Sequence, residues 1–172
     1  MLQFLLTIFA ILLIFGTAAW AGMSAAPYVP SRTRDVQRII ALAEIRPGDQ
    51  IVDCGSGDGR VVLAAAAAGA RAVGYEVSFI PWLISVIRGW RSPYRSRITF
   101  YWKSFYSVDL SEYDVVFAFL LPKGLQKLGA QLDQQKKIGR RILSFAWPIK
   151  NWIPDLKDKP ESTTLALWRY RQ

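Results

Sequence analysis

The sequence predicts an α/β fold in which a parallel sheet carries helices on both faces. Short apolar runs that fit strands alternate with segments that fit helices, and this alternation is typical of parallel sheets. The strand candidates are almost continuously apolar, as burial on both faces requires. A glycine-rich stretch between the first strand and the following helix predicts a binding crevice at the carboxyl edge of the sheet.

The elements of this sheet begin after residue 33. A helix is expected over 34–43, where apolar residues recur at helical spacing, and the turn "RPGD" follows it. The strand candidates are 50–54, 72–77, 98–102, 113–120, 141–147 and 163–169. The helix candidates between them are 60–68, 81–90 and 123–135. We therefore predict the folded domain to span residues 34–172.

Residues 1–22 are predicted to form a transmembrane anchor. They carry no charged side chain, and a helix of this length spans roughly 30 Å, the thickness of a bilayer core. A cleaved signal peptide is the alternative, because residues 19–21 fit an A-x-A cleavage site, although a basic n-region is missing. The first charged residue is Arg32, so we expect the domain on the cytoplasmic side, or on the mitochondrial matrix side.

Composition excludes several kinds of site. The 172 residues include 22 Lys and Arg against 13 Asp and Glu, and the net charge of +9 suits an anionic membrane surface, nucleic acid or an acidic partner. Cys54 is the only cysteine and there is no histidine. An internal disulfide, a histidine-based catalytic triad and a histidine-containing zinc site are therefore excluded, and we expect no metal.

The glycine-rich loop, "CGSGDGR", does not match the common phosphate-binding patterns. Its glycines stand at 55, 57 and 59, whereas the dinucleotide fingerprint G-x-G-x-x-G requires glycine where Arg60 stands. The P-loop pattern is also missing. NAD, FAD and nucleoside triphosphates are therefore disfavoured.

Acidic residues around this loop predict a ligand that carries positive charge. Asp53 and Asp58 flank the glycines and make the loop electronegative, and Glu76, at the end of the next strand, can accept both hydroxyls of a ribose. S-adenosylmethionine combines a ribose, an ammonium and a sulfonium. The alternative is a tight turn with capping acids that binds nothing.

Several segments resemble one family in their order along the chain. "VDCGSGDGR" and "VGYEV" resemble the cofactor motifs of class I S-adenosylmethionine-dependent methyltransferases. Together with "YVPS", "DLSEYDVVFAFLLPKGLQKL" and "ILSFAWPIKNWIPD", they resemble the membrane-anchored protein-lysine methyltransferases, which modify the ATP synthase c-ring protein and the adenine nucleotide translocase. The resemblance covers roughly residues 28–172. It implies a Rossmann-like sheet, S-adenosylmethionine as cofactor and one N-terminal transmembrane helix.

The resemblance also assigns site residues. Residues 23–33 become a linker and a lid over the cofactor. The cofactor-binding residues it implies are Tyr28, Pro30, Ser31, Asp53, Gly55, Ser56, Gly57, Asp58, Gly59, Glu76, Val77, Ser78, Ser104 and Phe105. Ser104 departs from the family, whose members carry Asp there to bond the adenine amine, so its hydrogen bond to the cofactor is expected to be weaker.

An acceptor channel is expected in "FAFLLP", residues 117–122. An apolar wall lowers the pKa of an incoming lysine by desolvation, and we expect Phe119, Leu121 and Pro122 to form it. Strand alternation would place Phe119 and Leu121 on one side, with Ala118 and Leu120 on the other. The alternative is ordinary core followed by a proline that starts a helix. No general base is assigned, because the nearby acids, at 109, 112 and 114, fit surface positions.

The predicted function is methylation of a lysine in a small membrane protein. The alternatives are methylation of a small molecule or lipid, and a domain that binds the cofactor without transferring its methyl group. Nucleic acid is disfavoured as acceptor, because no Asn or Asp precedes Pro122 to complete an adenine-methylation motif. The basic segments 136–141 and 169–171 either face anionic lipid or are solvated, and Trp147 and Trp152 are core, rim or membrane-interface residues.

Overall fold

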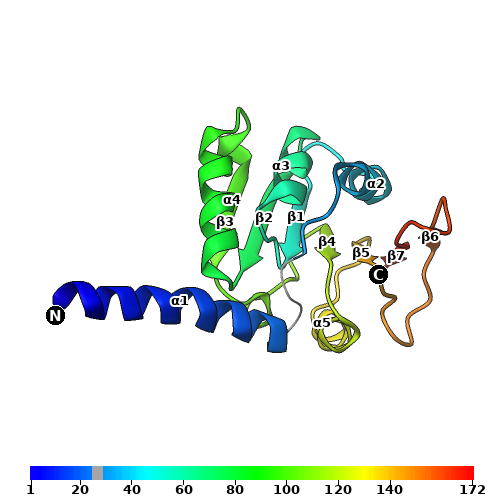
Figure 1. The fold of residues 1–172 in the computed structure, drawn as a ribbon. Coiled ribbons are helices and arrows are strands. Elements are labelled where there is room, and N and C mark those ends of the chain that lie inside the picture. Colours follow the sequence, from blue (N-terminus) through cyan, green and yellow to red (C-terminus); the bar gives the residue numbers. More distant parts are fainter. Residues whose placement is uncertain (25–28) are drawn as a thin grey trace.

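The fold is one seven-stranded sheet with helices on both faces (Figure 1). The computed structural model describes the backbone of residues 1–24 and 29–172, and the side chains of residues 1–17 and 29–172. The strands are β1 (Gln50–Cys54), β2 (Arg71–Glu76), β3 (Ile98–Trp102), β4 (Val115–Ala118), β5 (Arg141–Phe145), β6 (Leu156–Asp158) and β7 (Leu167–Arg171). The helices are α1 (Leu2–Ser24), α2 (Thr33–Ala43), α3 (Arg60–Ala67), α4 (Phe79–Arg91) and α5 (Pro122–Gln134), with short 3₁₀ turns η1 (Arg95–Arg97) and η2 (Phe105–Ser107).

The strand order is β3-β2-β1-β4-β5-β7-β6, and β1 to β5 run parallel, as predicted. The end of the sheet differs from the prediction. β7 pairs antiparallel with β5, and β6 pairs antiparallel with β7. No helix separates β5 from β7 to carry the chain back across a face, so the chain returns in the opposite direction. β6 escaped prediction because its three residues include a lysine and an aspartate and show no apolar pattern.

Alternate side chains of the parallel strands fill two separate cores. On one face, Ile51 packs with Val36 of α2 and Val61 of α3. On the other face, Val52 packs with Leu125 of α5. The two-sided burial explains why the strands read as continuous apolar runs.

β4 ends earlier than the sequence predicts. The predicted strand 113–120 pairs only over Val115–Ala118. The chain then leaves the sheet, and Pro122 begins α5 at a position where its missing N–H has no helical partner to lose. The residues between strand and helix therefore do not follow strand alternation.

The helix predicted at the N-terminus is present as α1, which projects from one side of the domain in Figure 1. The Phe79 backbone N–H, at the start of α4, donates a 3.2 Å hydrogen bond to Thr17 Oγ1. A search of the described residues found no helix with both the length and the apolar content of a membrane span. The transmembrane character predicted for residues 1–22 is therefore not confirmed.

Most arginines of the two basic segments are bound within the domain. Arg140 is fully buried and donates to the carbonyls of Leu110 and Tyr113. Arg141 pairs with Asp49 at 2.6 Å. Arg169 and Arg171 both pair with Asp155 and Glu44. The prediction that these four arginines face lipid is wrong, because carboxylates and carbonyls of the fold already satisfy them.

Gly59 tests how tightly the loop after β1 is packed. Its φ is +81°, and a Cβ there would lie 2.5 Å from Phe100 Cζ and 2.9 Å from Ser85 Cβ. Gly59→Ala should lower the free energy of unfolding by about 2–5 kcal/mol, the sum of a left-handed backbone cost and overpacking. Gly139→Ala is the matched control, because Gly139 has a φ of +80° with no neighbour within 4 Å. It should cost only about 1–2 kcal/mol. Equal costs in urea unfolding would refute the tight packing.

Candidate active site

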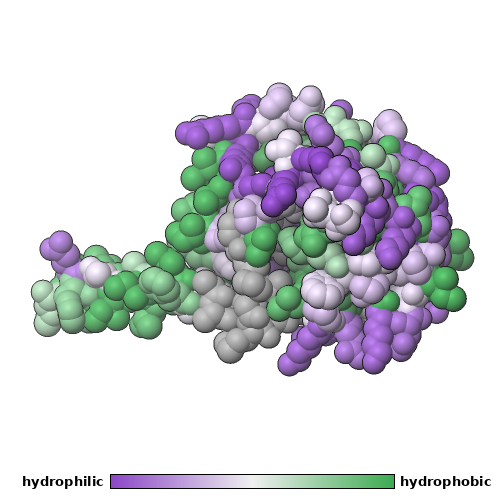
Figure 2. Space-filling model, turned by 45° about the vertical axis from the view of Figure 1, so that its right-hand side comes forward, coloured by the Kyte–Doolittle hydropathy of each residue, from purple (hydrophilic) through white to green (hydrophobic). Residues whose placement is uncertain are grey.

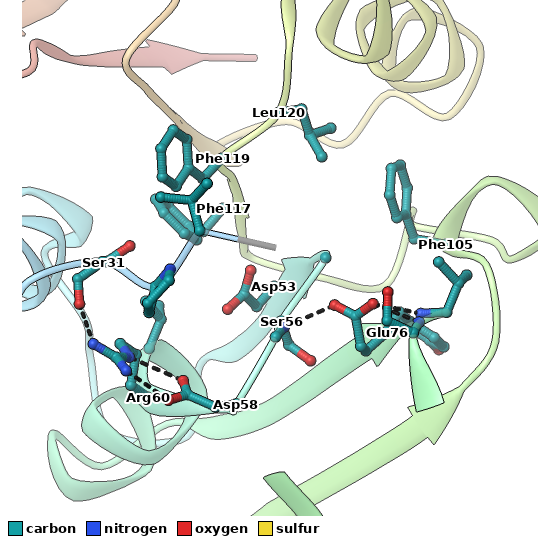
Figure 3. Close-up of a pocket in the computed structure, with 18 residues that line it drawn as sticks. Ser31, Asp53, Ser56, Asp58, Arg60, Glu76, Phe105, Phe117, Phe119 and Leu120 are labelled. Atoms are coloured by element: carbon teal, nitrogen blue, oxygen red, sulfur yellow. Dashed lines mark hydrogen bonds and ion pairs between the residues drawn. The ribbon is translucent and has the colours of Figure 1, made fainter. Parts of the chain in front are cut away.

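A cavity lies at the carboxyl ends of β1, β2 and β4 (Figure 3). It contains about 710 Å³ of empty space, part of it open to solvent, within the size range of ligand sites. Its lining residues are Val29, Pro30, Ser31, Asp53, Gly55, Ser56, Gly57, Asp58, Arg60, Val61, Tyr75, Glu76, Val77, Ser78, Phe105, Phe117, Phe119 and Leu120. The crevice predicted at the sheet edge is therefore present.

Most of the residues that the sequence assigned to cofactor binding meet in this cavity, although their role there stays a prediction. Gly59 and Ser104 are not among its lining residues. Gly59 instead allows close packing against Phe100. Tyr28 lies outside the described residues.

The Glu76 carboxylate is fixed by backbone amides. Its Oε2 accepts from Gly57 N–H at 2.9 Å, and its Oε1 accepts from Val77 N–H at 2.9 Å and Ser78 N–H at 2.7 Å. A carboxylate has about four lone-pair sites, so about one remains for a ligand. Glu76 can therefore accept one ligand hydroxyl without giving up a backbone bond, where the sequence suggested two.

Asp53 is a buried carboxylate at the centre of the cavity (Figure 3). Among the described residues, no donor makes a hydrogen bond to it. Burial, and then the negative charges of Glu76 and Asp58, raise the pKa of Asp53 well above its usual range. A cationic ligand would relieve this cost, so Asp53 fits the ammonium or sulfonium of S-adenosylmethionine.

Asp58 does not add free negative charge to the loop. Arg60 holds it at 2.6 Å, and Arg88 of α4 holds it from the other side. Burial acts to raise the pKa of Asp58, but the hydrogen bonds and charges of Arg60 and then Arg88 lower it to about 2. The prediction of a loop made electronegative by two acids is therefore wrong for Asp58, because two arginines neutralise it.

Arg60 also links the glycine loop to the segment that enters the domain. One guanidinium nitrogen donates to the backbone carbonyl of Ser31, while the others hold Asp58 (Figure 3). Ser31 is buried and lines the cavity. The predicted lid thus contacts the predicted cofactor loop through the residue that excluded a dinucleotide fingerprint.

Ser104 caps the turn after β3. Its Oγ accepts from Tyr106 N–H at 3.4 Å, and the next residue, Phe105, is buried against the cavity. The hydrogen bond predicted from Ser104 to an adenine is not supported by this placement, because the cavity wall here is the Phe105 ring.

The acceptor residues are arranged differently from the prediction. Phe119 and Leu120 both line the cavity, since β4 has already ended, whereas Leu121 is exposed and Pro122 begins α5. The prediction that Leu121 and Pro122 form the channel wall is therefore wrong. Phe117, which lies opposite Asp53 in the β1–β4 register, completes the apolar wall.

Phe119 separates the cavity from a neighbouring groove. Its ring packs edge-on against Phe145, with centroids 4.9 Å apart. The groove shares Phe119 and residues 29–31 with the cavity, and its outer walls include Asp35 and Glu161. Nothing in the sequence pattern predicted this groove, because its walls come from segments more than a hundred residues apart.

The acids considered as bases lie elsewhere. Asp114 precedes β4 at the amino edge of the sheet, accepts from Gln50 N–H and pairs with Lys137. Asp109 and Glu112 are exposed. None of the three lines the cavity. The cavity residues that the sequence did not predict are Val29, Arg60, Val61, Tyr75, Phe117 and Leu120. The last two stand inside "FAFLLP", so only the assumed strand alternation excluded them.

Comparisons with known proteins match this fold and this site. The ANTKMT methyltransferase domain family matches residues 53–156. The adenine nucleotide translocase lysine N-methyltransferase of Mus musculus is 37% identical over 151 residues, which are 86% of this chain and 65% of that protein. The lysine N-methyltransferase of the ATP synthase c-ring protein of Xenopus laevis is 37% identical, over 75% of this chain and 57% of that protein. A protein-lysine N-methyltransferase of Saccharolobus islandicus is 31% identical, over 74% of this chain and 81% of that protein.

One solved structure has both high structural and appreciable sequence similarity. An RNA methyltransferase from Salinibacter ruber, in complex with S-adenosyl-L-homocysteine, superposes with a TM-score of 0.78 and 30% identity. The match covers 83% of this chain and 93% of that chain.

Strand order, glycine loop and acidic cavity define a class I methyltransferase domain with S-adenosylmethionine as cofactor. Within that class, the chain belongs to the ANTKMT methyltransferase domain family. It spans a little over half the length of the vertebrate ATP synthase methyltransferases that it matches.

Asp53 should make cofactor binding depend on pH. Because its pKa is raised in the free protein and a cation favours its ionised form, binding should release a proton at neutral pH. Affinity for S-adenosylmethionine should therefore rise with pH, by up to about tenfold per pH unit below the raised pKa. Asp53→Asn should bind more weakly and without this slope. Calorimetry of the full chain from pH 6 to 9 measures it, with the exposed Asp109→Asn as control. A flat wild-type profile would refute the assignment.

Asp58 should contribute stability that acid removes. Its pKa is lowered in the folded state, so its contribution is complete above the ordinary Asp pKa and disappears as pH falls through about 2. At pH 7, Asp58→Asn should cost about 2 kcal/mol of unfolding free energy. The gap between wild type and variant should narrow below about pH 4. Urea unfolding at several pH values tests this, with Glu112→Gln as control. A gap that widens on acidification would contradict the ion pairs.

Proposed function

We propose that this protein transfers a methyl group from S-adenosylmethionine to a lysine of a small membrane protein. The observation that carries the proposal is the division of the cavity into two halves. Buried carboxylates, Asp53 and Glu76, form one half, and the side chains of Phe117, Phe119 and Leu120 form the other (Figure 3). The first half fits a cationic ribonucleoside, and the second fits an alkyl amine.

The cofactor half is held ready by the backbone. Bound S-adenosylmethionine supplies a methyl group activated by a positively charged sulfur. Asp53 would hold a positive charge of the cofactor, and the remaining lone pair of Glu76 Oε2 would hold a hydroxyl. Ser56 Oγ is buried without a hydrogen-bond partner among the described residues, so it offers a further polar contact. These groups fit the cofactor with few polar atoms left unpaired.

The acceptor half suits lysine for a physical reason. A lysine must be neutral to act as a nucleophile, and an apolar wall favours the neutral amine by desolvation. The groove beyond Phe119 gives a long side chain a route to the cavity, and Asp35 and Glu161 stand at its rim. Residues 29–31 and Phe119 would position the chain so that the amine meets the methyl group at short range.

Named relatives support a membrane-protein acceptor. The Mus musculus relative is an adenine nucleotide translocase lysine N-methyltransferase, the Xenopus laevis relative acts on a lysine of the ATP synthase c-ring protein, and the Saccharolobus islandicus relative is a protein-lysine N-methyltransferase. We extend this to a membrane location for the present chain, with α1 inserted in the bilayer and the domain on the cytoplasmic or matrix side. The exposed apolar side chains of α1, among them Phe4, Phe9 and Phe15, favour this location.

RNA is the second candidate acceptor. The Salinibacter ruber protein is an RNA methyltransferase, and the net charge of +9 suits a polyanion. Against RNA, many of the arginines are already paired with carboxylates of the fold, including Arg38, Arg141, Arg169 and Arg171.

Radioactive methyl transfer by the full chain separates these acceptors. Native membranes and total RNA are each incubated with the protein and methyl-labelled S-adenosylmethionine. We expect label in a small hydrophobic protein, and methyl-lysine after its hydrolysis. Label in extractable lipid or in RNA would overturn the lysine assignment. Cofactor binding without any labelled product would overturn the catalytic one.

Phe119 gives the matched variants for this assay. Phe119→Ala should reduce transfer at least tenfold, because positioning of the acceptor is lost, while cofactor affinity stays within about twofold. Phe119→Leu keeps an apolar wall and should restore much of the rate. Glu76→Ala is the inactive control, and loss of a charge-assisted hydrogen bond should weaken cofactor binding about ten- to a hundred-fold. Unchanged transfer in a stably folded Phe119→Ala protein would remove Phe119 from the acceptor site.

A further inference from the structure

Helix α4 presents its large apolar residues outward and its small residues inward. The buried positions are Pro81, Ser85 and Gly89. A Cβ at Gly89 would lie 2.9 Å from Phe100 Cε2, so the helix approaches the sheet closely only because its inner face is small. A helix that packs on a soluble domain normally shows the opposite arrangement. The outer face of α4 therefore requires a separate explanation.

The outer face is a continuous apolar stripe. Its members are spaced as neighbours on one side of a helix: Ile80, Leu83, Ile84, Ile87 and Trp90. Each aliphatic member is 37–42% exposed, and Trp90 is 72% exposed. Trp102 of the edge strand β3 adds its ring beside the stripe, stacked on Trp82 with centroids 5.6 Å apart. We call this set the α4 surface.

The α4 surface continues into α1. The first residue of α4, Phe79, is hydrogen-bonded to Thr17 of α1, and the two helices pack together there. In Figure 1, α1 leaves the domain on the α4 side and runs crosswise to α4. Figure 2 shows hydrophobic atoms along that side of the domain and along α1. A plane laid against the α4 surface would therefore have α1 projecting through it.

The charge around the α4 surface has one sign. Residues 77–108 contain no Asp or Glu and five basic residues. Arg88 is used by Asp58, but Arg91, Arg95 and Arg97 are exposed, and within the described part of the chain no carboxylate pairs with them. These three extend from the last turn of α4 into η1. Apolar stripe, tryptophans and arginines together have the composition of a membrane-interface element.

We infer that the α4 surface docks on a phospholipid bilayer that carries anionic headgroups. The stripe enters the outer hydrocarbon boundary, Trp90 and Trp102 lie at headgroup level, and Arg91, Arg95 and Arg97 bind lipid phosphates. A second copy of the chain fits less well, because a two-fold contact would bring the same unpaired arginines of both copies together.

Docking would hold the cavity close to the bilayer. α4 begins directly after Ser78, which lines the cavity, so the docked face and the cofactor site are joined by one residue. The inference concerns a surface outside the active site and holds whichever acceptor is methylated.

Site-specific fluorescence on the full chain tests the inference. Cysteines at Ile84 and Ile87 are labelled in separate proteins with an environment-sensitive dye, the native Cys54 being fully buried. The proteins are reconstituted in vesicles of phosphatidylcholine with 30% phosphatidylglycerol. Both labels should shift to shorter wavelength and be quenched by lipids with a nitroxide near the top of the acyl chain. Arg91→Gln with Arg95→Gln should lower the docked fraction, about fivefold in its equilibrium constant per arginine.

The controls make the test decisive. A label at Ile138, which is 98% exposed in the loop before β5, should remain unquenched, and one at Phe9 of α1 should be quenched. Unquenched α4 labels beside a quenched Phe9 label would overturn the inference. So would equal quenching on phosphatidylcholine alone, or a shift without vesicles that grows with protein concentration, which would identify a second copy instead.

Discussion

The carboxylate of Glu76 is the constraint on which the site depends. It joins the end of β2 to the loop after β1 by accepting three backbone N–H groups, and so fixes two neighbouring strand ends relative to each other. The glycine loop can then turn sharply, with Gly55, Gly57 and Gly59 all at positive φ, without opening away from the sheet. Shape and charge of the cavity floor both follow from this one contact.

Charge is distributed unequally over the cavity floor. Asp58 belongs to an ion-pair network that stabilises the loop, whereas Asp53 is buried without a counter-charge among the described residues. Two acids five residues apart thus have opposite roles, one structural and one available to a ligand. This division is typical of functional sites, where an unfavourable charge is kept because binding relieves it.

The sequence predicted the parallel half of the fold and most of the cavity floor, because both depend on local patterns. Apolar runs located β1 to β5, and the glycines and Glu76 located the crevice. The antiparallel end, the roles of Arg60 and Arg88, and the groove beside Phe119 could not be predicted, since each depends on contacts between distant segments. Leu121 was misplaced because strand periodicity was extended past Ala118, where pairing stops.

The contact between Arg60 and the Ser31 carbonyl has a mechanical consequence. Residues 29–31 are at once the part of the chain that enters the domain from the side of α1 and a wall shared by the cavity and the groove. A pull on α1 would be transmitted to that wall, and through Arg60 to the loop that holds Asp58. The depth of the cavity is therefore coupled to the tension in the tether, so the N-terminal helix acts as a lever as well as an attachment.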